Sequence, residues 1–377
     1  MKETLIKELN RFQDDQSLWQ ELAWKKSEDG KDYHDDNALK RTRVLYALQW
    51  DLQSSDEDLL RFLMEEEIKD RNADPFQGSS ESLVAGGYLL ASFKNPANVW
   101  LFVQAKSANF DTHCGFDYQH LLSAGVQATF DYIAQNKDPE HKAQANRYQE
   151  YFDDYFPDLA TCSLSEDDIV SWHQYKQDDY LKVPSDEDTK YWLEVALEID
   201  ELPIAQKLVV QLETQSDESL DALSDLKFYK EQVGDYAGAT VIAKKVFEQR
   251  ENAAWKDYVA LIQSHLNNDD PASAWQMIAQ ALETCGSLSD YEQKRTHELA
   301  LDVVLASDGH QSFALEAYRL SMNNIDRNLA LVDLEKHLEA TRLMGDKASE
   351  LIVKQRYDAE NDRINASRSR LKNNKGS

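Results

Sequence analysis

The sequence predicts an all-α protein built as an array of helical hairpins, and three observations support that prediction. Its 377 residues include only 12 glycines and 7 prolines, so residues that favour turns are scarce. Leucine, alanine and long polar side chains fill the segments between them, as helices joined by short turns require. Apolar residues recur with helical spacing, and in the second half of the chain this pattern itself repeats. We therefore expect an extended helical array rather than two ordinary globular domains.

The charge balance narrows the classes of partner. The chain holds 69 acidic against 41 basic side chains, a formal net charge of −28. A field of that sign repels phosphate backbones and anionic lipid headgroups, so we expect neither nucleic acid nor a membrane surface as a partner. The same field keeps a soluble chain monodisperse, and it speeds encounter with a basic protein.

Cysteine usage and the N-terminus indicate a reducing compartment. The 3 cysteines are far apart and in no CxxC arrangement, so the sequence predicts neither a disulfide framework nor a zinc knuckle. The first residues lack the apolar run of a signal peptide, and the longest apolar runs, such as Val99–Val103, are much shorter than a membrane span. We expect a cytoplasmic protein.

Residues 1–137 are predicted to form N-terminal helical hairpins. Apolar residues with helical spacing indicate a helix or a short hairpin over residues 1–26, broken near Asp14. The helices expected after it, in order, span residues 38–53, 54–70, 83–93, 97–106 and 116–134. We expect the first two of these to pair as a hairpin, and the next two to form another. Residues 107–115 are expected to be an irregular connection that leads into the single long helix 116–134.

Residues 138–184 are an acidic, aromatic-rich connecting segment. From Asp138 to Tyr180 there are 11 acidic residues against 3 basic ones, and the helical pattern weakens. Tyrosines and phenylalanines between positions 148 and 156 can still line one helix face, which Pro157 would end. Ser185 has Asp188 three positions on, a capping-box spacing, so we place a domain boundary between residues 184 and 185.

The segment 185–345 repeats itself. Small residues at Ala205, Ala239, Ala274 and Ala314 are separated by 34, 35 and 40 positions. Apolar residues stand thirteen positions before each alanine and four positions after it: Trp192, Leu226, Leu261 and Leu301 before, and Val209, Ala243, Ile278 and Tyr318 after. Two helices per unit with this period are typical of an α-solenoid. Residues 346–377 are then predicted to be a capping helix that ends in a basic tail.

This pattern resembles the tetratricopeptide repeat, and the resemblance covers about a third of the chain. In that family the small residue lies where the two helices of a unit cross, and peptide contacts come from the first helix of each unit. The resemblance implies a partner-binding surface that includes Lys227, Lys230, Glu231, Lys256, Gln263 and Asn267. These residues do not reproduce the Lys/Asn set that grips a C-terminal carboxylate, so we do not expect a chaperone tail as the partner.

The sharpest chemical cluster is His113, Cys114, Asp117 and His120, four potential metal ligands within eight residues. If Asp117 and His120 lie in the first turns of a helix, their i, i+3 spacing places them on one face, where a loop ligand can complete a metal site. In the alternative interpretation Asp117 only caps the helix and Cys114 fills a gap in the core. The chain contains neither a GxGxxG nor a GxxxxGK[ST] sequence, so no phosphate-cradling loop of these kinds is predicted.

These observations lead to two hypotheses of different classes. The first is a non-enzymatic helical repeat scaffold or adaptor that binds a protein or peptide partner, with no catalytic residue and no cofactor. Its more specific version is an immunity or antitoxin protein that neutralises a basic toxin by charge complementarity. The alternative is a metal-dependent enzyme or metal-binding protein centred on His113 to His120.

Overall fold

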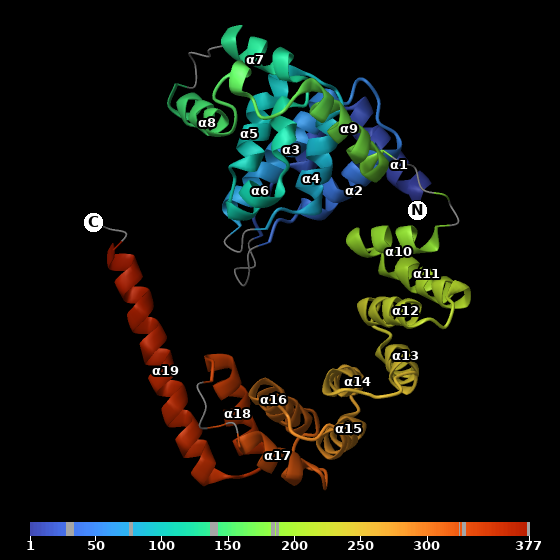
Figure 1. Cartoon of the computed structure of the whole chain (residues 1–377), viewed down its shortest axis with the longest axis vertical. Coiled ribbons are helices and arrows are strands. Elements are labelled where there is room, and N and C mark those ends of the chain that lie inside the picture. Colours follow the sequence, from blue (N-terminus) through green and yellow to red (C-terminus); the bar gives the residue numbers. More distant parts are fainter. Residues whose placement is uncertain are drawn as a thin grey trace. The chain divides into compact units, whose positions relative to one another are not determined.

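A computed structural model describes residues 1–27, 34–74, 78–135, 142–181, 185, 188–323, 325 and 329–374 (Figure 1). Within these residues the chain is all-α, with 19 α-helices, short 3-10 helices and a single isolated bridge between Lys26 and Asp35. Helices pack largely against their chain neighbours, as the predicted helical array requires. The predicted fold class is therefore confirmed. The contacts divide the chain into two compact units, Met1–Glu201 and Leu202–Ser377.

The first unit contains ten α-helices in its described residues. They are α1 Lys2–Asp14, α2 Ala38–Trp50, α3 Glu57–Ala73, α4 Glu81–Ala91, α5 Val99–Lys106, α6 Phe110–Gly115, α7 Val126–Gln135, α8 Lys142–Tyr155, α9 Glu166–Tyr180 and α10 Thr189–Glu198. Four 3-10 helices join them: η1 Gln16–Leu22, η2 Pro96–Asn98, η3 Tyr118–Leu122 and η4 Leu159–Thr161.

Helix α4 is the centre of this unit. The Ser80 side chain caps its first turn by accepting a hydrogen bond from the Leu83 amide at 3.1 Å. Every residue of α4 from Ala85 to Ala91 is buried, because α2, α3, α9 and η3 all pack against it. Gly87 permits a close approach of Phe116, since a Cβ at this position would lie 2.6 Å from the Phe116 ring.

Local pairing in the first unit differs from the expectation. Helix α2 packs mainly against α1 and α4, whereas α3 packs against α4 and α5, so 38–53 and 54–70 do not form a hairpin of their own. The expected helices 83–93 and 97–106 likewise do not pair, because α5 packs on α3. Sequence periodicity indicates which face of a helix is buried, but it does not say which neighbour buries it.

The predicted long helix 116–134 is wrong. The chain forms η3, turns, and then starts α7 after Gly125, whose φ of +107° no helix can contain. The expected irregular connection 107–115 instead contains α6, which begins with a capping box between Asn109 and Thr112. The acidic segment is also more helical than expected, since it holds α8 and α9.

The contacts place helix α10 in the first unit, which ends at Glu201, whereas the sequence suggests a boundary between residues 184 and 185. The rings of Trp50 and Trp192 lie 5.2 Å apart, and Trp50 Nε1 donates to the Tyr191 hydroxyl at 3.1 Å. Arg43 also pairs with Glu201 at 2.8 Å. These contacts with α2 are non-local, which is why the local capping pattern could not reveal them. The observed cap of α10 is Asp188, which accepts from the Tyr191 amide.

The second unit contains nine α-helices in its described residues. They are α11 Leu202–Gln215, α12 Leu220–Gln232, α13 Tyr236–Glu248, α14 Trp255–Asn267, α15 Pro271–Thr284, α16 Asp290–Ala306, α17 Ala314–Met322, α18 Leu331–Leu343 and α19 Lys347–Asn374. The most extensive packing joins α12 with α13, α14 with α15, α16 with α17, and α18 with α19. The first helices of successive pairs also touch, α14 with α16 and α16 with α18.

The residues that define the sequence repeat are buried in this unit. Ala205, Ala239, Ala274 and Ala314 are at most 1% exposed, and so there is space at these positions only for a small side chain. The apolar positions that flank the alanines within the unit are buried as well: Leu226, Leu261, Leu301, Val209, Ala243, Ile278 and Tyr318. The membership of the tetratricopeptide family stays a prediction.

The turn between the paired helices also recurs. The amide of Asp235 donates to Lys230 O at 2.8 Å, that of Asp270 to His265 O at 2.9 Å, and that of Asp346 to Thr341 O at 2.9 Å. In each case the preceding residue has a positive φ, and the aspartate then caps the next helix. A tight turn of the same geometry therefore closes three of the helix pairs.

Candidate functional site

The structure separates the four residues of the 113–120 cluster. His120 is only 1% exposed; its Nδ1–H donates to the Asp117 carbonyl at 2.8 Å, and its ring stacks on Phe116 at 4.1 Å. Its Nε2 has no polar partner among the described residues and faces Gly87. Burial lowers the pKa of His120 to about 4, so the imidazole is neutral near pH 7. It is a packing residue of the η3–α4 contact.

Asp117 points to a different set of partners. Its carboxylate accepts from Trp172 Nε1 at 3.0 Å and pairs with Lys176 at 3.0 Å, both on α9. Burial acts to raise the pKa of Asp117, but these two hydrogen bonds and the lysine charge leave the pKa below its usual value. The expected helix cap is absent, since no side-chain cap bond is made at Asp117. The carboxylate instead ties η3 to α9.

His113 and Cys114 lie on α6 and have other neighbours than His120. His113 Nδ1 is 2.6 Å from the Tyr151 hydroxyl of α8, and Cys114 is exposed rather than filling a core gap. Between them and the core, the buried Lys106 amine donates to the carbonyls of His113 at 2.8 Å and Phe116 at 2.6 Å. Burial lowers the pKa of Lys106. Lys106 thus satisfies carbonyls at the end of α6 that the helix itself leaves unpaired.

No group of three or more His, Cys, Asp or Glu residues in the described part of the chain is arranged to hold a metal ion. The hypothesis of a metal centre at His113, Cys114, Asp117 and His120 therefore gains no geometric support. Proximity in sequence placed these side chains within eight residues, but α6 and η3 direct them to different neighbours.

The predicted partner-binding surface contains one residue that is clearly structural. Lys230 is 5% exposed and bridges Glu213 of α11 at 2.9 Å to Asp235, the cap of α13, at 3.0 Å. Burial acts to lower the pKa of Lys230, yet the two carboxylates raise it. Lys230 is therefore engaged in holding its own helices together.

The remaining five residues of that surface are at least partly exposed. Lys227 pairs with Glu231 at 2.8 Å along α12, and Gln263 donates to Asn267 at 3.1 Å along α14. Lys256 is exposed. These side chains can therefore reach a partner.

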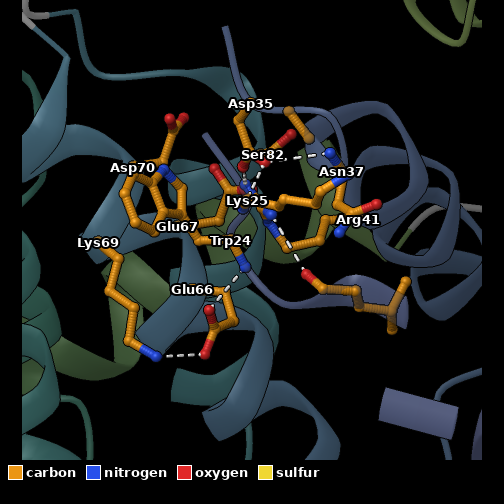
Figure 2. A network of polar contacts seen from close by, with 12 residues as sticks. Trp24, Lys25, Asp35, Asn37, Arg41, Glu66, Glu67, Lys69, Asp70 and Ser82 are labelled. Atoms are coloured by element: carbon orange, nitrogen blue, oxygen red, sulfur yellow. Dashed lines mark hydrogen bonds and ion pairs between the residues drawn. The ribbon is translucent and has the colours of Figure 1, made fainter. Parts of the chain in front are cut away.

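A network of polar contacts in the first unit surrounds Arg41 of α2 (Figure 2). Arg41 is fully buried and pairs with Asp35 and with Glu67 of α3, each at 2.6 Å. Its Nη1 also donates to the Leu22 carbonyl at 3.2 Å. Burial acts to lower the pKa of Arg41, but the carboxylates of Glu67 and Asp35 raise it. The guanidinium of Arg41 thus links three parts of the chain: η1, the residues just before α2, and helix α3.

Hydrogen bonds from backbone amides to Asp35 and Glu66 hold the same chain segments in place (Figure 2). Asp35 Oδ1 accepts from the amides of Lys25 at 2.9 Å and Asn37 at 3.0 Å, and the Trp24 amide donates to Glu66 at 2.7 Å. Each acceptor faces the backbone of the segment that leads into α2. We interpret the network as structural, because its charges are buried and satisfied by one another.

A cleft in the first unit offers a better candidate site. Helices α2, α4, α9 and α10 surround a hollow of about 190 Å³. It is lined by Thr42, Leu45, Tyr46 and Gln49 of α2, by Glu81, Ser82 and Ala85 of α4, by Asp179 and Tyr180 of α9, and by Tyr191 and Glu198 of α10. We call it the tyrosine cleft. Three tyrosines and three carboxylates line it, and its lining contains no basic residue.

The electrostatics of the tyrosine cleft follow from this lining. Burial and then the charge of Glu198 raise the pKa of Tyr46, and burial together with Glu81 and Asp179 raises the pKa of Tyr180 to about 12. Both phenols therefore stay neutral near pH 7. The three carboxylates are exposed at the rim. The site has apolar and aromatic walls under a negative potential.

The sequence did not identify this cleft. Its residues come from four helices between positions 42 and 198, and no two of these helices are consecutive in the chain except α9 and α10. The available signal was weak: the acidic segment ends in Asp179 and Tyr180, next to a predicted helix that carries Tyr191 and Glu198 seven positions apart on one face.

Comparisons with known proteins give no match: no family model, no curated protein and no solved structure resembles the chain significantly. Among the described residues, no helix has both the length and the apolar character needed to cross a membrane.

Proposed function

We propose that this chain is a non-enzymatic binding protein whose acidic first unit recognises a basic protein partner. The distribution of charge carries this proposal. Residues 1–201 hold 41 acidic against 20 basic side chains, a formal charge of −21, whereas residues 202–377 hold 28 against 21, a charge of −7. Three quarters of the excess negative charge thus belongs to one unit, which general solubility alone does not require.

Several basic side chains of that unit are already engaged. Arg41 and Arg43 each pair with two carboxylates, and Lys176 pairs with Asp117. Exposed carboxylates remain at both ends of α9, in Glu166–Asp168 and Asp178–Asp179. A field of this kind raises the rate of encounter with a positively charged protein and disfavours acidic competitors.

The second unit is proposed to be the scaffold of a helical repeat adaptor. The burial of the repeat alanines and the recurring turn support a regular array, and the resemblance to tetratricopeptide repeats suggests that such an array can present a binding surface. A more specific proposal is an immunity or antitoxin protein that covers a basic toxin. A gene for a small basic protein directly beside this one would favour that version, and a housekeeping neighbourhood would count against it.

The proposal is tested by capture from the native cell. The full-length chain is immobilised, and bound proteins are quantified by mass spectrometry at low and high ionic strength. The native chain is compared with a neutralised variant, in which exposed carboxylates of the first unit are replaced. This variant combines Asp14→Asn, Glu150→Gln, Asp154→Asn, Asp167→Asn and Asp178→Asn. We expect the native chain to retain a basic partner at low ionic strength and to lose it at high ionic strength. The neutralised variant should capture less of the same partner. The proposal is overturned if the native chain and the neutralised variant capture equally basic proteins and if these proteins resist high ionic strength equally on both.

A further inference from the structure

We infer that the tyrosine cleft is the recognition site for one lysine or arginine side chain of the basic partner. This inference rests on the proposed function and names the site at which the partner would be anchored. Interfaces of this kind commonly depend on a few side chains that enter pockets, while the surrounding contacts contribute little.

The size of the cleft selects a small occupant. Sites for drug-sized ligands and cofactors usually measure roughly 300–1,000 Å³. The tyrosine cleft, at about 190 Å³, is smaller than that range. It is therefore suited to a single side chain presented by a larger molecule, and not to a nucleotide or another large cofactor.

The charge of the lining selects a cation. Glu81, Asp179 and Glu198 contribute three carboxylates from three different helices, and no lysine, arginine or histidine lines the cleft. Two arginines of α2 flank the lining residue Thr42 in sequence, and both are already paired: Arg41 with Asp35 and Glu67, and Arg43 with Glu8 and Glu201. An anion would meet only negative potential here.

The spacing of the carboxylates excludes a bare metal ion as the favoured occupant. The three lining carboxylates are described, yet they do not form a group that could hold a metal ion. The three carboxylates are better suited to an organic cation, whose charged group is attached to a carbon chain. An alkylammonium or guanidinium group meets this requirement, because its methylene chain contacts apolar walls while its head reaches the rim.

The aromatic walls strengthen the same preference. Cations bind favourably over tyrosine rings, and the cleft contains Tyr46, Tyr180 and Tyr191. A second layer holds each ring: Tyr46 packs against Trp50 at 6.1 Å, and Tyr180 packs against Tyr88 at 5.4 Å. Trp50 Nε1 also donates to the Tyr191 hydroxyl at 3.1 Å. The rings are thus positioned before the partner arrives, which lowers the entropic cost of binding.

One cation of the protein itself lies near these rings and must be considered. Lys176 Nζ lies 5.7 Å from the centroid of the Tyr180 ring. It does not line the cleft, and its charge is paired with Asp117 at 3.0 Å. Lys176 therefore leaves the three rim carboxylates available to an incoming side chain.

The test uses two small probes on the full-length chain. Nα-acetyl-lysine N-methylamide carries the proposed group, and Nα-acetyl-norleucine N-methylamide is its uncharged counterpart. Methyl NMR signals of Leu45 and Ala85, which line the cleft, report binding. We expect saturable shifts of both signals with the lysine probe and none with the norleucine probe. Absence of a saturable lysine response at these methyls overturns the inference.

Two variants of equal charge separate the cleft from the general field. The cleft variant combines Glu81→Gln, Asp179→Asn and Glu198→Gln, and the control variant combines Asp14→Asn, Glu150→Gln and Asp154→Asn. All six side chains are exposed, so both proteins are expected to fold. The cleft variant should bind the lysine probe about tenfold more weakly, whereas the control should change its affinity by less than about twofold. Equal losses in the two variants overturn the inference.

The outcomes also distinguish this inference from the proposed function. If a basic partner is captured in a salt-dependent way but binds the cleft and control variants equally, the proposed function holds and the cleft is not its anchor. If the lysine probe binds the cleft but no basic partner is captured, the cleft recognises cations and the proposed function fails.

Discussion

Replacement of Arg41 by methionine is the most direct perturbation of the first unit. The change removes a fully buried guanidinium and leaves the carboxylates of Asp35 and Glu67, each 2.6 Å from it in the native protein, without their counter-charge. Breaking a buried ion pair from one side costs about 3–5 kcal/mol. For a unit of this size we expect the melting temperature to fall by roughly 6–20 °C.

Urea unfolding followed by tryptophan fluorescence measures this loss, because 6 of the 8 tryptophans lie in residues 1–201. The matched control is Arg11→Met, since Arg11 is exposed and pairs with Glu21 at only 3.6 Å; its cost should stay within about 0.5 kcal/mol. The triple variant Asp35→Asn, Arg41→Met and Glu67→Gln removes all three charges and should lose less stability than Arg41→Met alone. A cost of Arg41→Met below about 1 kcal/mol would refute the structural interpretation of the network.

The same variant should respond to pH in a defined direction. Burial raises the pKa of Glu67 even with Arg41 present, and removal of the arginine takes away a charge that lowers it. A carboxyl whose folded pKa is raised binds its proton more tightly when folded, so it penalises folding increasingly as pH rises from the unfolded value toward the folded one. The stability deficit of Arg41→Met should therefore be smaller at pH 5 than at pH 7. An unchanged or larger deficit at pH 5 would contradict this reasoning.

Three further predictions concern other positions. Gly87→Ala should destabilise the first unit by about 1–3 kcal/mol, because the new Cβ would lie 2.6 Å from a buried phenylalanine ring, whereas Gly86→Ala, which meets a flexible methionine sulfur at 3.1 Å, should cost clearly less in the same denaturation assay. Lys230→Met should destabilise the second unit by about 1–2 kcal/mol without abolishing partner capture, while exposed Lys256→Met should leave stability within about 0.5 kcal/mol; the reverse order would mean that Lys230 is not structural. The buried His120, with a pKa lowered to about 4, favours the folded state above pH 6.5 and loses that contribution as pH falls toward 4, so His120→Gln should reduce the stability difference between pH 7 and pH 5.

In the second unit, the local spacing of residues in the sequence predicts much of the helix packing. The spacing of Ala239, Ala274 and Ala314 predicted three of the observed helix pairs, α12 with α13, α14 with α15 and α16 with α17, and all four repeat alanines are among the most buried residues of the unit. Such positions can be inferred because each helix pair is built from neighbours in sequence and because only a small side chain fits where two helices cross closely. Even there, the sequence assigned Lys230 to a binding surface, since charge alone does not reveal that Glu213 and Asp235 already hold it.

The first unit shows where local pattern fails. The cluster of His113, Cys114, Asp117 and His120 looked chemical because its members are close in sequence, but their side chains meet different neighbours. Residue types that can bind metal are also those that cap helices and satisfy carbonyls, so type and spacing cannot decide between these roles. The decisive information is the direction of each side chain, which depends on how α6 and η3 pack.

The sequence by itself determined that this protein is helical and acidic and that neighbouring helices pair in its second half, because periodicity, turn composition and charge are local or additive properties. Only the tertiary structure decided that α10 joins the first unit, that Arg41 is buried between two carboxylates, and that Tyr46, Tyr180 and Tyr191 share one cleft. The physical reason is that packing between different helices brings these residues together, across 26 positions for Arg41 and Glu67 and across 141 for Trp50 and Tyr191, and an amphipathic helix encodes the face that it buries but not the partner that buries it.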